Sequence, residues 1–251
     1  MRILYSEDYN RMSLQAAKVV AAQIILKPDS VLGLATGASP VGMYKQLIEW
    51  YQKGDLSFAK VKAVNLDEYK GLSKDHPNSY YRFMCENFFS YVNIDLNYVY
   101  IPNGLNKNIT DECNKYNKII ESLGGIDFQV LGIGHNGHIG YNEPGESFNI
   151  ETHCVKLSQS TKEANKRFFN SIDDVPDYAY TMGIKPIMHA KKILVLTNGG
   201  DKKDVLLDAF FGPVIPAVPA SILQLHNDVI ICGDKSCLKR IVDKYPLSVE
   251  R

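Results

Sequence analysis

The chain has 251 residues, of which 45% are hydrophobic, 10% aromatic and 22% charged. A chain of this length buries about 70–75% of its unfolded surface, so it requires neither a disulfide framework nor a structural metal. Lysine and arginine total 28, as do aspartate and glutamate, which gives a formal net charge of zero. Because proteins that bind nucleic acids or membrane surfaces usually carry a basic excess, this balance argues against both partners and favours a small-molecule ligand.

The amino terminus and the cysteines indicate the compartment. The opening residues become acidic at Glu7 and Asp8, so we expect no signal peptide, and the apolar run Val19–Leu26 is too short to span a bilayer. Five cysteines are scattered at spacings that fit neither a CxxC redox pair nor a zinc ribbon: Cys85, Cys113, Cys154, Cys232 and Cys237. We expect them to be reduced thiols in a cytoplasmic protein.

Short apolar runs alternate with longer amphipathic stretches, and no linker or repeat divides them. The expected strands are Val31–Ala35, Val61–Asn65, Tyr98–Ile101, Phe128–Leu131, Lys192–Thr197 and Val229–Cys232. The expected helices are Tyr9–Leu26, Val41–Lys53, Ser79–Tyr91, Asp111–Leu123, Lys162–Asn170, Lys202–Phe210 and Lys235–Lys244. The strands are rich in Val, Ile and Leu without polar alternation, which is typical of a parallel sheet buried on both faces. We therefore expect an α/β fold in one domain over residues 1–251, an open, mostly parallel sheet with helices on both faces in a Rossmann-like three-layer sandwich.

Ligands of such sheets bind beyond the carboxyl ends of the strands, so the loops after the strands are the candidate sites. The first is the run from Gly33 to Pro40, whose central residues Gly37, Ala38 and Ser39 are small. Small residues let the backbone approach an anion, and the first turn of the following helix attracts it. The alternative is a tight strand-to-helix turn with a serine cap. The run is neither a Walker A loop nor a GxGxxG fingerprint.

The second loop carries two adjacent acids, Asp67 and Glu68, at the end of a buried strand. One carboxylate there can act as a general base if the pocket desolvates it. The alternative is that Asp67 hydrogen-bonds loop backbone while Glu68 is solvated.

The third loop, residues 132–145, contains four glycines up to Gly140 and a fifth at Gly145, with two histidines and a glutamate. Glycines contribute no side chain to packing and lose more backbone entropy on folding than other residues. A place in the hydrophobic core therefore does not explain this composition. One interpretation is a zinc site that uses His135 and His138, although the spacing lacks a third ligand. We prefer a couple of His138 with Glu143, in which the carboxylate fixes the tautomer of an imidazole that transfers protons.

Two basic residues follow later in the chain. Arg167 lies on a helical pattern opened by Ser160 and Thr161, and Lys202 lies at a strand-to-helix turn. Each alone is typical of a surface charge. Arginine suits bidentate recognition of phosphate and lysine a point contact, so together they can hold an anion at the first loop.

Five segments in order resemble the glucosamine/galactosamine-6-phosphate isomerase family, and within it the glucosamine-6-phosphate deaminases. They are GLATGASPVGMY, NLDEYKGL with HPNSYYRFM, LGIGHNGHIGYNEPG, STKEANKRFF and VPASILQLH, which run from residue 33 to residue 226. The resemblance implies a single-domain α/β sandwich that converts glucosamine 6-phosphate and water to fructose 6-phosphate and ammonia in amino-sugar catabolism. It implies no metal and no organic cofactor.

The resemblance also implies roles for individual residues. Asp67 is the base that moves a proton between C2 and C1, and His138 assists ring opening, with Glu143 and Asn136 orienting it. The implied phosphate ligands are Gly37, Ala38, Ser39, Arg167 and Lys202.

The sequence departs from the family's pattern at two places. Some members have aspartate where this chain has Asn136, which cannot be a base and can only orient His138 or the sugar. Allosteric members carry a basic cluster after the NEP segment, whereas here Glu146 to Thr152 is acidic. We therefore expect no activation by N-acetylglucosamine 6-phosphate, and either a monomer or a homo-oligomer.

Three alternatives stay open. 6-Phosphogluconolactonases share the fold but typically continue differently after the Gly-His pair, so the run from Asn142 to Pro144 favours the deaminases. A sugar-phosphate sensor would lack Asp67 or His138, and both are present. A preference for the galactosamine epimer depends on the shape of the pocket.

Overall fold

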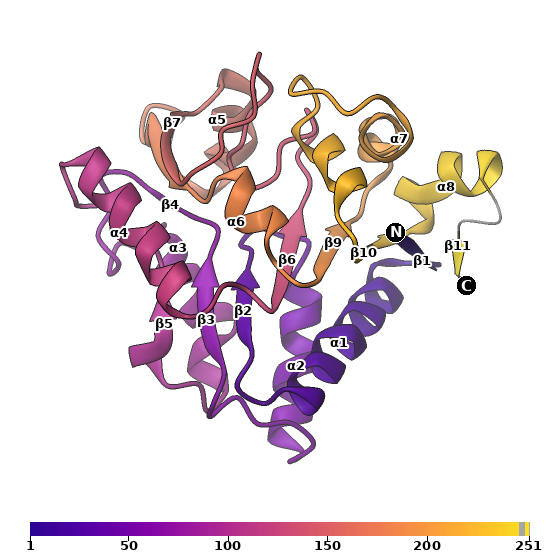
Figure 1. Cartoon of the computed structure of the whole chain (residues 1–251), viewed down its shortest axis with the longest axis horizontal. Coiled ribbons are helices and arrows are strands. Elements are labelled where there is room, and N and C mark those ends of the chain that lie inside the picture. The colour runs from indigo at the N-terminus through magenta and orange to yellow at the C-terminus, as the bar shows by residue number, and fades with distance from the viewer. Residues whose placement is uncertain (246–248, 251) are drawn as a thin grey trace.

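The computed structural model describes residues 1–245 and the backbone of residues 249–250, and these build a large sheet with helices on either side. Eight strands make up the sheet in the described residues: β1 (Arg2–Ser6), β2 (Val31–Leu34), β3 (Lys62–Asn65), β5 (Val99–Tyr100), β6 (Phe128–Gly132), β9 (Ile193–Thr197), β10 (Val229–Asp234) and β11 (Val249–Glu250). Their order is β11-β1-β10-β9-β6-β2-β3-β5, and all the pairings are parallel. In Figure 1 the central strands β2, β3 and β6 point upward, so their carboxyl ends share the upper edge.

The α-helices of the described chain are α1 (Tyr9–Leu26), α2 (Val41–Gln52), α3 (Tyr80–Asn87), α4 (Ile109–Ser122), α5 (Gln159–Asn165), α6 (Ile184–Met188), α7 (Lys203–Phe211) and α8 (Lys235–Lys244). Short 3₁₀ helices are η1 (Phe89–Tyr91), η2 (Leu96–Tyr98), η3 (Lys166–Phe168), η4 (Gly200–Lys202) and η5 (Pro219–Leu225). Right-handed crossovers place α1, α2 and α3 on one face and α4, α7 and α8 on the other. The packing agrees, because α2 contacts both α1 and α3, while α7 contacts α8. The expected open parallel sheet with helices on both faces is confirmed.

The burial of the strands agrees with a sheet that helices cover on both faces. The residues of β9 and β10 are buried along their whole length, as expected for strands covered by helices on both faces. On α1 the buried positions include Met12, Ala16, Val20 and Ile24, spaced four apart on one face, and its amino terminus is capped by Asp8, which accepts from the Arg11 amide at 2.8 Å.

Each predicted helix and strand is present, with its ends displaced by a few residues. The largest displacements are at α5, which ends at Asn165, five residues before the predicted end, and begins at Gln159, three residues before the predicted start. Ser158 explains the early start, because its hydroxyl accepts from the Thr161 amide and caps the helix. The predictions omitted β1, β11 and α6.

A second, antiparallel sheet was also not predicted. It contains β4 (Asp67–Tyr69), β7 (His153–Lys156) and β8 (Tyr178–Thr181) in the order β4-β8-β7. The strands are only three or four residues long, and β7 is half-buried, so neither length nor hydrophobic pattern indicates them. Leu66 joins the two sheets, since its amide donates to Leu34 and its carbonyl accepts from Met182.

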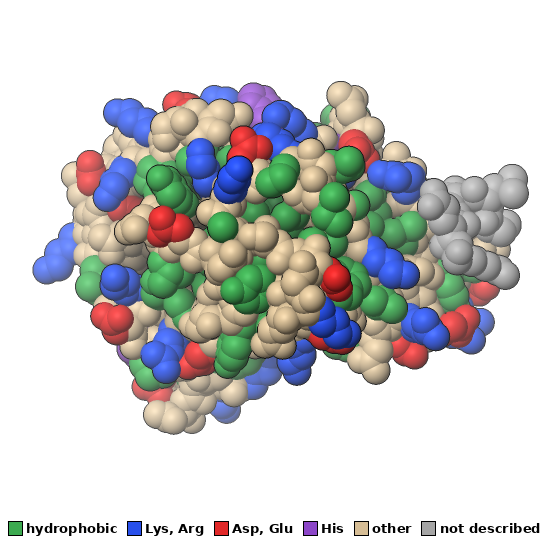
Figure 2. All heavy atoms as spheres, turned by 90° about the horizontal axis from the view of Figure 1, so that it is seen from below, with side chains coloured by type: hydrophobic (Ala, Val, Ile, Leu, Met, Phe, Trp, Pro, Cys, Tyr) green, Lys and Arg blue, Asp and Glu red, His purple; other side chains and the backbone are tan. Residues whose placement is uncertain are grey.

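The surface is mixed in charge. Figure 2, seen from below relative to Figure 1, shows basic and acidic side chains interspersed, in keeping with the balanced composition. Among the described helices none is both long and apolar enough to cross a membrane. The five cysteines are free thiols.

Candidate active site

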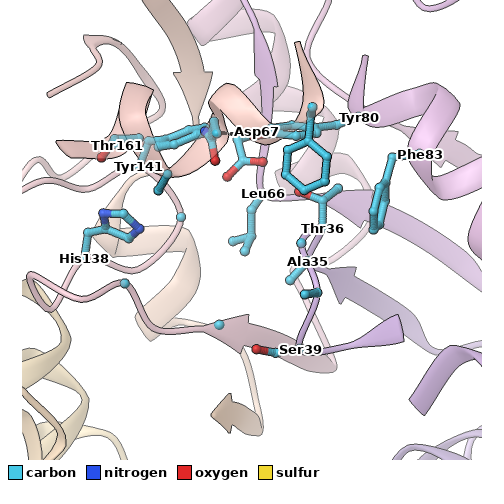
Figure 3. Close-up of a pocket in the computed structure, with 18 of the residues that line it drawn as sticks. Ala35, Thr36, Ser39, Leu66, Asp67, Tyr80, Phe83, His138, Tyr141 and Thr161 are labelled. Atoms are coloured by element: carbon cyan, nitrogen blue, oxygen red, sulfur yellow. Dashed lines mark hydrogen bonds between the residues drawn. The ribbon is translucent and has the colours of Figure 1, made fainter. Parts of the chain in front are cut away.

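A cavity of about 850 Å³ lies at the carboxyl edge of the large sheet, within the range of small-molecule sites of roughly 300–1,000 Å³. Its walls come from the loops after β2, β3, β6 and β9 and from the α5–η3 segment (residues 159–168). The predicted site residues that line it are Gly37, Ala38, Ser39, Asp67, Asn136, His138, Arg167 and Lys202. Figure 3 shows Asp67, His138 and Ser39 placed around the open centre. The predicted Glu143 lies behind His138 and does not line the cavity.

The loop after β2 is an open turn and has no serine cap. Gly37 has a φ of +89°, a conformation that side-chain-bearing residues rarely adopt. The Ser39 hydroxyl donates to Oδ1 of Asn198 at 2.7 Å, and α2 begins after Pro40 with no side-chain cap. The Tyr9 hydroxyl steadies the turn by donating to the Ala38 carbonyl at 2.9 Å.

The residues of this turn, Gly37, Ala38 and Ser39, line the cavity. Within the described part of the chain, the amides of Gly37, Ala38 and Ser39 donate to no protein group. They sit just before the amino terminus of α2, where the helix dipole favours an anion.

The two predicted cations lie near the turn. Lys202, at the end of η4, is half-buried, and burial lowers the pKa of its ammonium group. The positive charge of Arg167 lowers the same pKa, so the two cations are neighbours. Arg167 itself is exposed, with its guanidinium 4.8 Å from the centre of the Phe168 ring. The sequence prediction that both face one anion site is consistent with this geometry.

Asp67 begins β4 and pairs with Thr181 of β8, which places its side chain in the cavity. Its exposure is only 7%, and within the described residues its carboxylate makes no hydrogen bond. Burial, and next the charge of Glu68, raise the pKa of Asp67 to about 8. A desolvated carboxyl of this kind is characteristic of a general base.

Glu68 is buried at 2% exposure, so the alternative in which it is solvated is wrong. Its carboxylate accepts from the amides of Tyr69, Tyr80 and Tyr81 at 2.9–3.0 Å. Two of these amides belong to the first turn of α3, whose dipole favours a negative charge. Burial raises the pKa of Glu68 to about 7 although these three bonds lower it. The backbone contacts that the sequence analysis considered for Asp67 belong to Glu68.

His138 and Glu143 form the expected couple. Nδ1 of His138 lies 3.2 Å from Oε1 of Glu143. That oxygen also accepts from the Thr161 hydroxyl at 2.8 Å, and Oε2 accepts from Nδ2 of Asn136 at 2.6 Å. Burial acts to raise the pKa of Glu143, but the nearby His138 imidazole and the hydrogen bonds from Thr161 and Asn136 outweigh it, so that the pKa lies below its usual range. Glu143 is therefore a carboxylate at neutral pH. Asn136 contacts both members of the couple, because its Oδ1 accepts from the backbone amide of His138 at 3.2 Å.

The two histidines of the loop after β6 have separate partners. Nε2 of His135 lies 2.5 Å from Oδ2 of Asp201, at the exposed rim of the cavity, while His138 pairs with Glu143. Among the described residues no group of three or more His, Cys, Asp or Glu side chains is arranged to hold a metal ion.

Sequence reasoning missed a polar cluster that surrounds Asp67 and Glu143. The hydroxyls of Tyr80 and Tyr141 are hydrogen-bonded to each other, and Nδ2 of Asn165 donates to Tyr141 at 2.9 Å. Thr161 and Asn165 are four residues apart, which puts both on one face of α5. That spacing was the signal available in the sequence.

The chain was compared with known proteins. A family model described as glucosamine-6-phosphate isomerases/6-phosphogluconolactonase matches residues 8–232. Glucosamine-6-phosphate deaminase of Lachnoclostridium phytofermentans is 54% identical over 233 residues, which cover 92% of this chain and 99% of the relative. The deaminase of Clostridium botulinum (strain Langeland) is 52% identical over 241 residues, which cover 96% and 99%.

Solved structures agree. A monomeric glucosamine-6-phosphate deaminase matches with a TM-score of 0.93 and 45% identity, covering 95% of this chain and 99% of that one. A 6-phosphogluconolactonase from Thermotoga maritima matches with a TM-score of 0.71 and 20% identity, covering 93% and 99%, and this likeness shows the fold alone. The chain therefore belongs to the glucosamine-6-phosphate isomerase/6-phosphogluconolactonase family.

Proposed function

We infer that this chain is a glucosamine-6-phosphate deaminase, which converts glucosamine 6-phosphate and water to fructose 6-phosphate and ammonia. The observation that carries the inference is the placement of Asp67 and His138 in one cavity with the anion turn at Gly37–Ser39. The relatives that are more than half identical over nearly the whole chain bear the same name.

The phosphate of the substrate binds at the turn after β2. Backbone amides of Gly37, Ala38 and Ser39 donate to it, and Arg167 and Lys202 neutralise its charge. This contact fixes the sugar relative to the reacting groups, and positioning of this kind is worth several kcal/mol of barrier, on the order of 7 in favourable cases.

Ring opening is assigned to His138. The imidazole transfers a proton between the anomeric hydroxyl and the ring oxygen, while Glu143 stabilises the imidazolium form and keeps Nδ1 facing it. Asn136 and Thr161 hold the two oxygens of Glu143. The product of this step is the open-chain aldehyde with its amine on C2.

Asp67 performs the isomerisation. Its carboxylate removes the proton on C2, which leaves an enolamine, and returns a proton to C1, which gives an iminium group at C2. Water adds to C2 and ammonia leaves, so that fructose 6-phosphate is formed. A base must be ionised, and the positive charge of the substrate's ammonium group favours the ionised form of Asp67.

We further propose that residues 1–251 form one domain that acts as a monomer in the cytoplasm, in the breakdown of amino sugars, without a metal or organic cofactor. The relative of known structure is described as monomeric, and it covers 95% of this chain.

The test is release of ammonia and fructose 6-phosphate from glucosamine 6-phosphate, with EDTA and with N-acetylglucosamine 6-phosphate each added or omitted. We expect equal amounts of both products and no effect of either addition. Galactosamine 6-phosphate and 6-phosphogluconolactone are the comparison substrates. A chain that hydrolyses the lactone and releases no ammonia contradicts the proposal.

A further inference from the structure

The α5–η3 segment contacts the catalytic loop through one face of its helix. Thr161 donates its hydroxyl to Oε1 of Glu143 at 2.8 Å, and one turn later Asn165 donates to the hydroxyl of Tyr141 at 2.9 Å. Both acceptors belong to the loop after β6. Arg167 follows within the same segment and lines the cavity. A segment that carries a phosphate ligand therefore also holds the group behind His138.

The direction of the bond from Thr161 is determined by Glu143, because an ionised carboxylate only accepts. A hydroxyl group has a single hydrogen, so Thr161, which gives its hydrogen to Glu143, accepts from the Ser158 hydroxyl at 2.8 Å. Thr161 is buried at 6% exposure, where water does not replace a lost donor.

The oxygen of Glu143 that accepts from Thr161 is also the oxygen that faces His138. Oε1 of Glu143 lies 3.2 Å from Nδ1 of His138, whereas Oε2 is held by Asn136. The side-chain amide of Asn136 restrains one oxygen of the carboxylate. Without Thr161, the oxygen opposite the imidazole loses its hydrogen-bond donor, and Asn136 alone restrains the carboxylate about its last torsion.

We propose that Thr161 is a positioning residue for ring opening, whose hydroxyl holds Oε1 of Glu143 against His138. This inference rests on the proposed function, because it assigns the His138–Glu143 couple to ring opening. Thr161 also lines the cavity, but in this role it acts through Glu143 and not by contact with the sugar or its phosphate.

The test compares Thr161→Val, which keeps the shape and removes the hydroxyl, with Thr161→Ser, which keeps the hydroxyl. Thr161→Ala is the second hydroxyl-free variant, in case the valine variant does not fold. Gln159→Ala, an exposed change on the same helix, is the matched control. Each variant is assayed for kcat and KM with glucosamine 6-phosphate and for binding of 2-amino-2-deoxyglucitol 6-phosphate, an open-chain analogue that has no ring to open.

We expect Thr161→Val to lower kcat about tenfold, because the variant loses one hydrogen bond to a charged group. KM and the affinity for the analogue should stay near their wild-type values. Thr161→Ser and Gln159→Ala should keep the wild-type kcat. In the Glu143→Gln background, Thr161→Val should have almost no further effect, because residues that act through one another are not additive.

Three results overturn the inference: an unchanged kcat in both hydroxyl-free variants, an undiminished effect in the Glu143→Gln background, or a loss of analogue binding equal to the loss of kcat. Wild-type protein that releases no ammonia contradicts the proposed function instead. The two failures are thus distinguishable.

Discussion

Asp67 and Glu68 are adjacent carboxyl groups with opposite surroundings. Glu68 accepts three amide hydrogens and lies at the first turn of α3, while Asp67 accepts none within the described residues and faces the cavity. Both are buried, and burial raises the pKa of each. Glu68 holds the backbone through its contacts with these amides. Asp67 is therefore the carboxyl group that is available to a substrate.

The first prediction concerns turnover. Asp67→Asn removes the base and keeps the shape, so kcat should fall by about 10²–10⁴-fold, the usual contribution of a general base. Binding of the open-chain analogue should be nearly unchanged, because the phosphate contacts remain. Steady-state kinetics and calorimetry measure the two quantities, and full activity in this variant removes Asp67 from its role.

The second prediction concerns stability and pH. The pKa of Asp67 in the folded protein is about 8, well above its value of roughly 3.9 in an unfolded chain. Between these values the folded state binds the extra proton, so the free energy of unfolding decreases as pH rises from about 4 to about 8. Asp67→Asn removes this dependence, and its stability relative to wild type should increase across that window.

The gain should be on the order of a few kcal/mol at pH 8, because one pKa unit corresponds to about 1.4 kcal/mol. Urea unfolding of both proteins at pH 5 and pH 8 measures it. An equal difference between them at the two pH values would contradict the raised pKa.

The third prediction concerns the phosphate. Arg167→Ala should raise KM for glucosamine 6-phosphate by about tenfold or more and change kcat less, because the guanidinium contributes binding at a distance from the reacting carbons. Because Arg167 is exposed, we expect the variant to keep the wild-type melting temperature, which is measured alongside. An unchanged KM shows that the phosphate site lies elsewhere.

At the scale of the element, the loop after β6 depends on the close contact between Gly134 and the His138 ring. A Cβ atom at Gly134 would lie 2.3 Å from Nε2 of His138 and within 2.6 Å of two further ring atoms. Within the turn, Gly134 donates its amide to the carbonyl of His138 and accepts from the amide of Gly137, both at 3.0 Å. The glycine therefore leaves the space that the imidazole occupies.

The fourth prediction follows from that contact. Gly134→Ala should displace the imidazole and lower kcat by about 10²-fold or more, on the scale of a lost acid–base group, with a smaller effect on stability. Gly145→Ala, in the same loop, is the matched control, because a Cβ there meets no atom closer than 3.8 Å, its φ is not in the left-handed region, and it does not line the cavity. Equal activity of the two variants contradicts the proposed packing.

At the scale of the whole molecule, the large sheet joins the two ends of the chain. β1 pairs with β10 along its whole length and with β11 on its other side. The main cluster of buried hydrophobic residues has members from Ile3 to Ile241, and a second, small cluster includes Tyr69 of β4 and Ala179 of β8. The site loops project from this one sheet.

The fifth prediction concerns cooperativity. If residues 1–251 form one domain, urea unfolding monitored by far-ultraviolet circular dichroism and by fluorescence of Trp50, the single tryptophan, should give coincident transitions. Trp50 lies on α2, whereas the circular dichroism reports the helices of both faces. Two separated midpoints would show that the chain unfolds in parts.

Much of the fold and most of the candidate site follow from local patterns. The strands β9 and β10 were predictable because buried parallel strands have no polar alternation, and α8 because its amphipathic period is regular. The small sheet was not predictable, because β4 is three residues long and is a strand only through its pairing with β8. The cavity residues in the loops that follow the strands were predictable because the loops after parallel strands meet at one edge of the sheet.

The sequence by itself determined the order and type of the main elements and the loops that carry Asp67, His138, Arg167 and Lys202, since periodicity and glycine content act over short stretches. Only the tertiary structure decided that Glu68 rather than Asp67 binds the backbone, and that Thr161 holds Glu143. These contacts join groups 12 to 18 positions apart in the chain, from separate elements. No local pattern specifies such contacts, because they exist only once the small sheet and α5 have packed over the carboxyl ends of the strands.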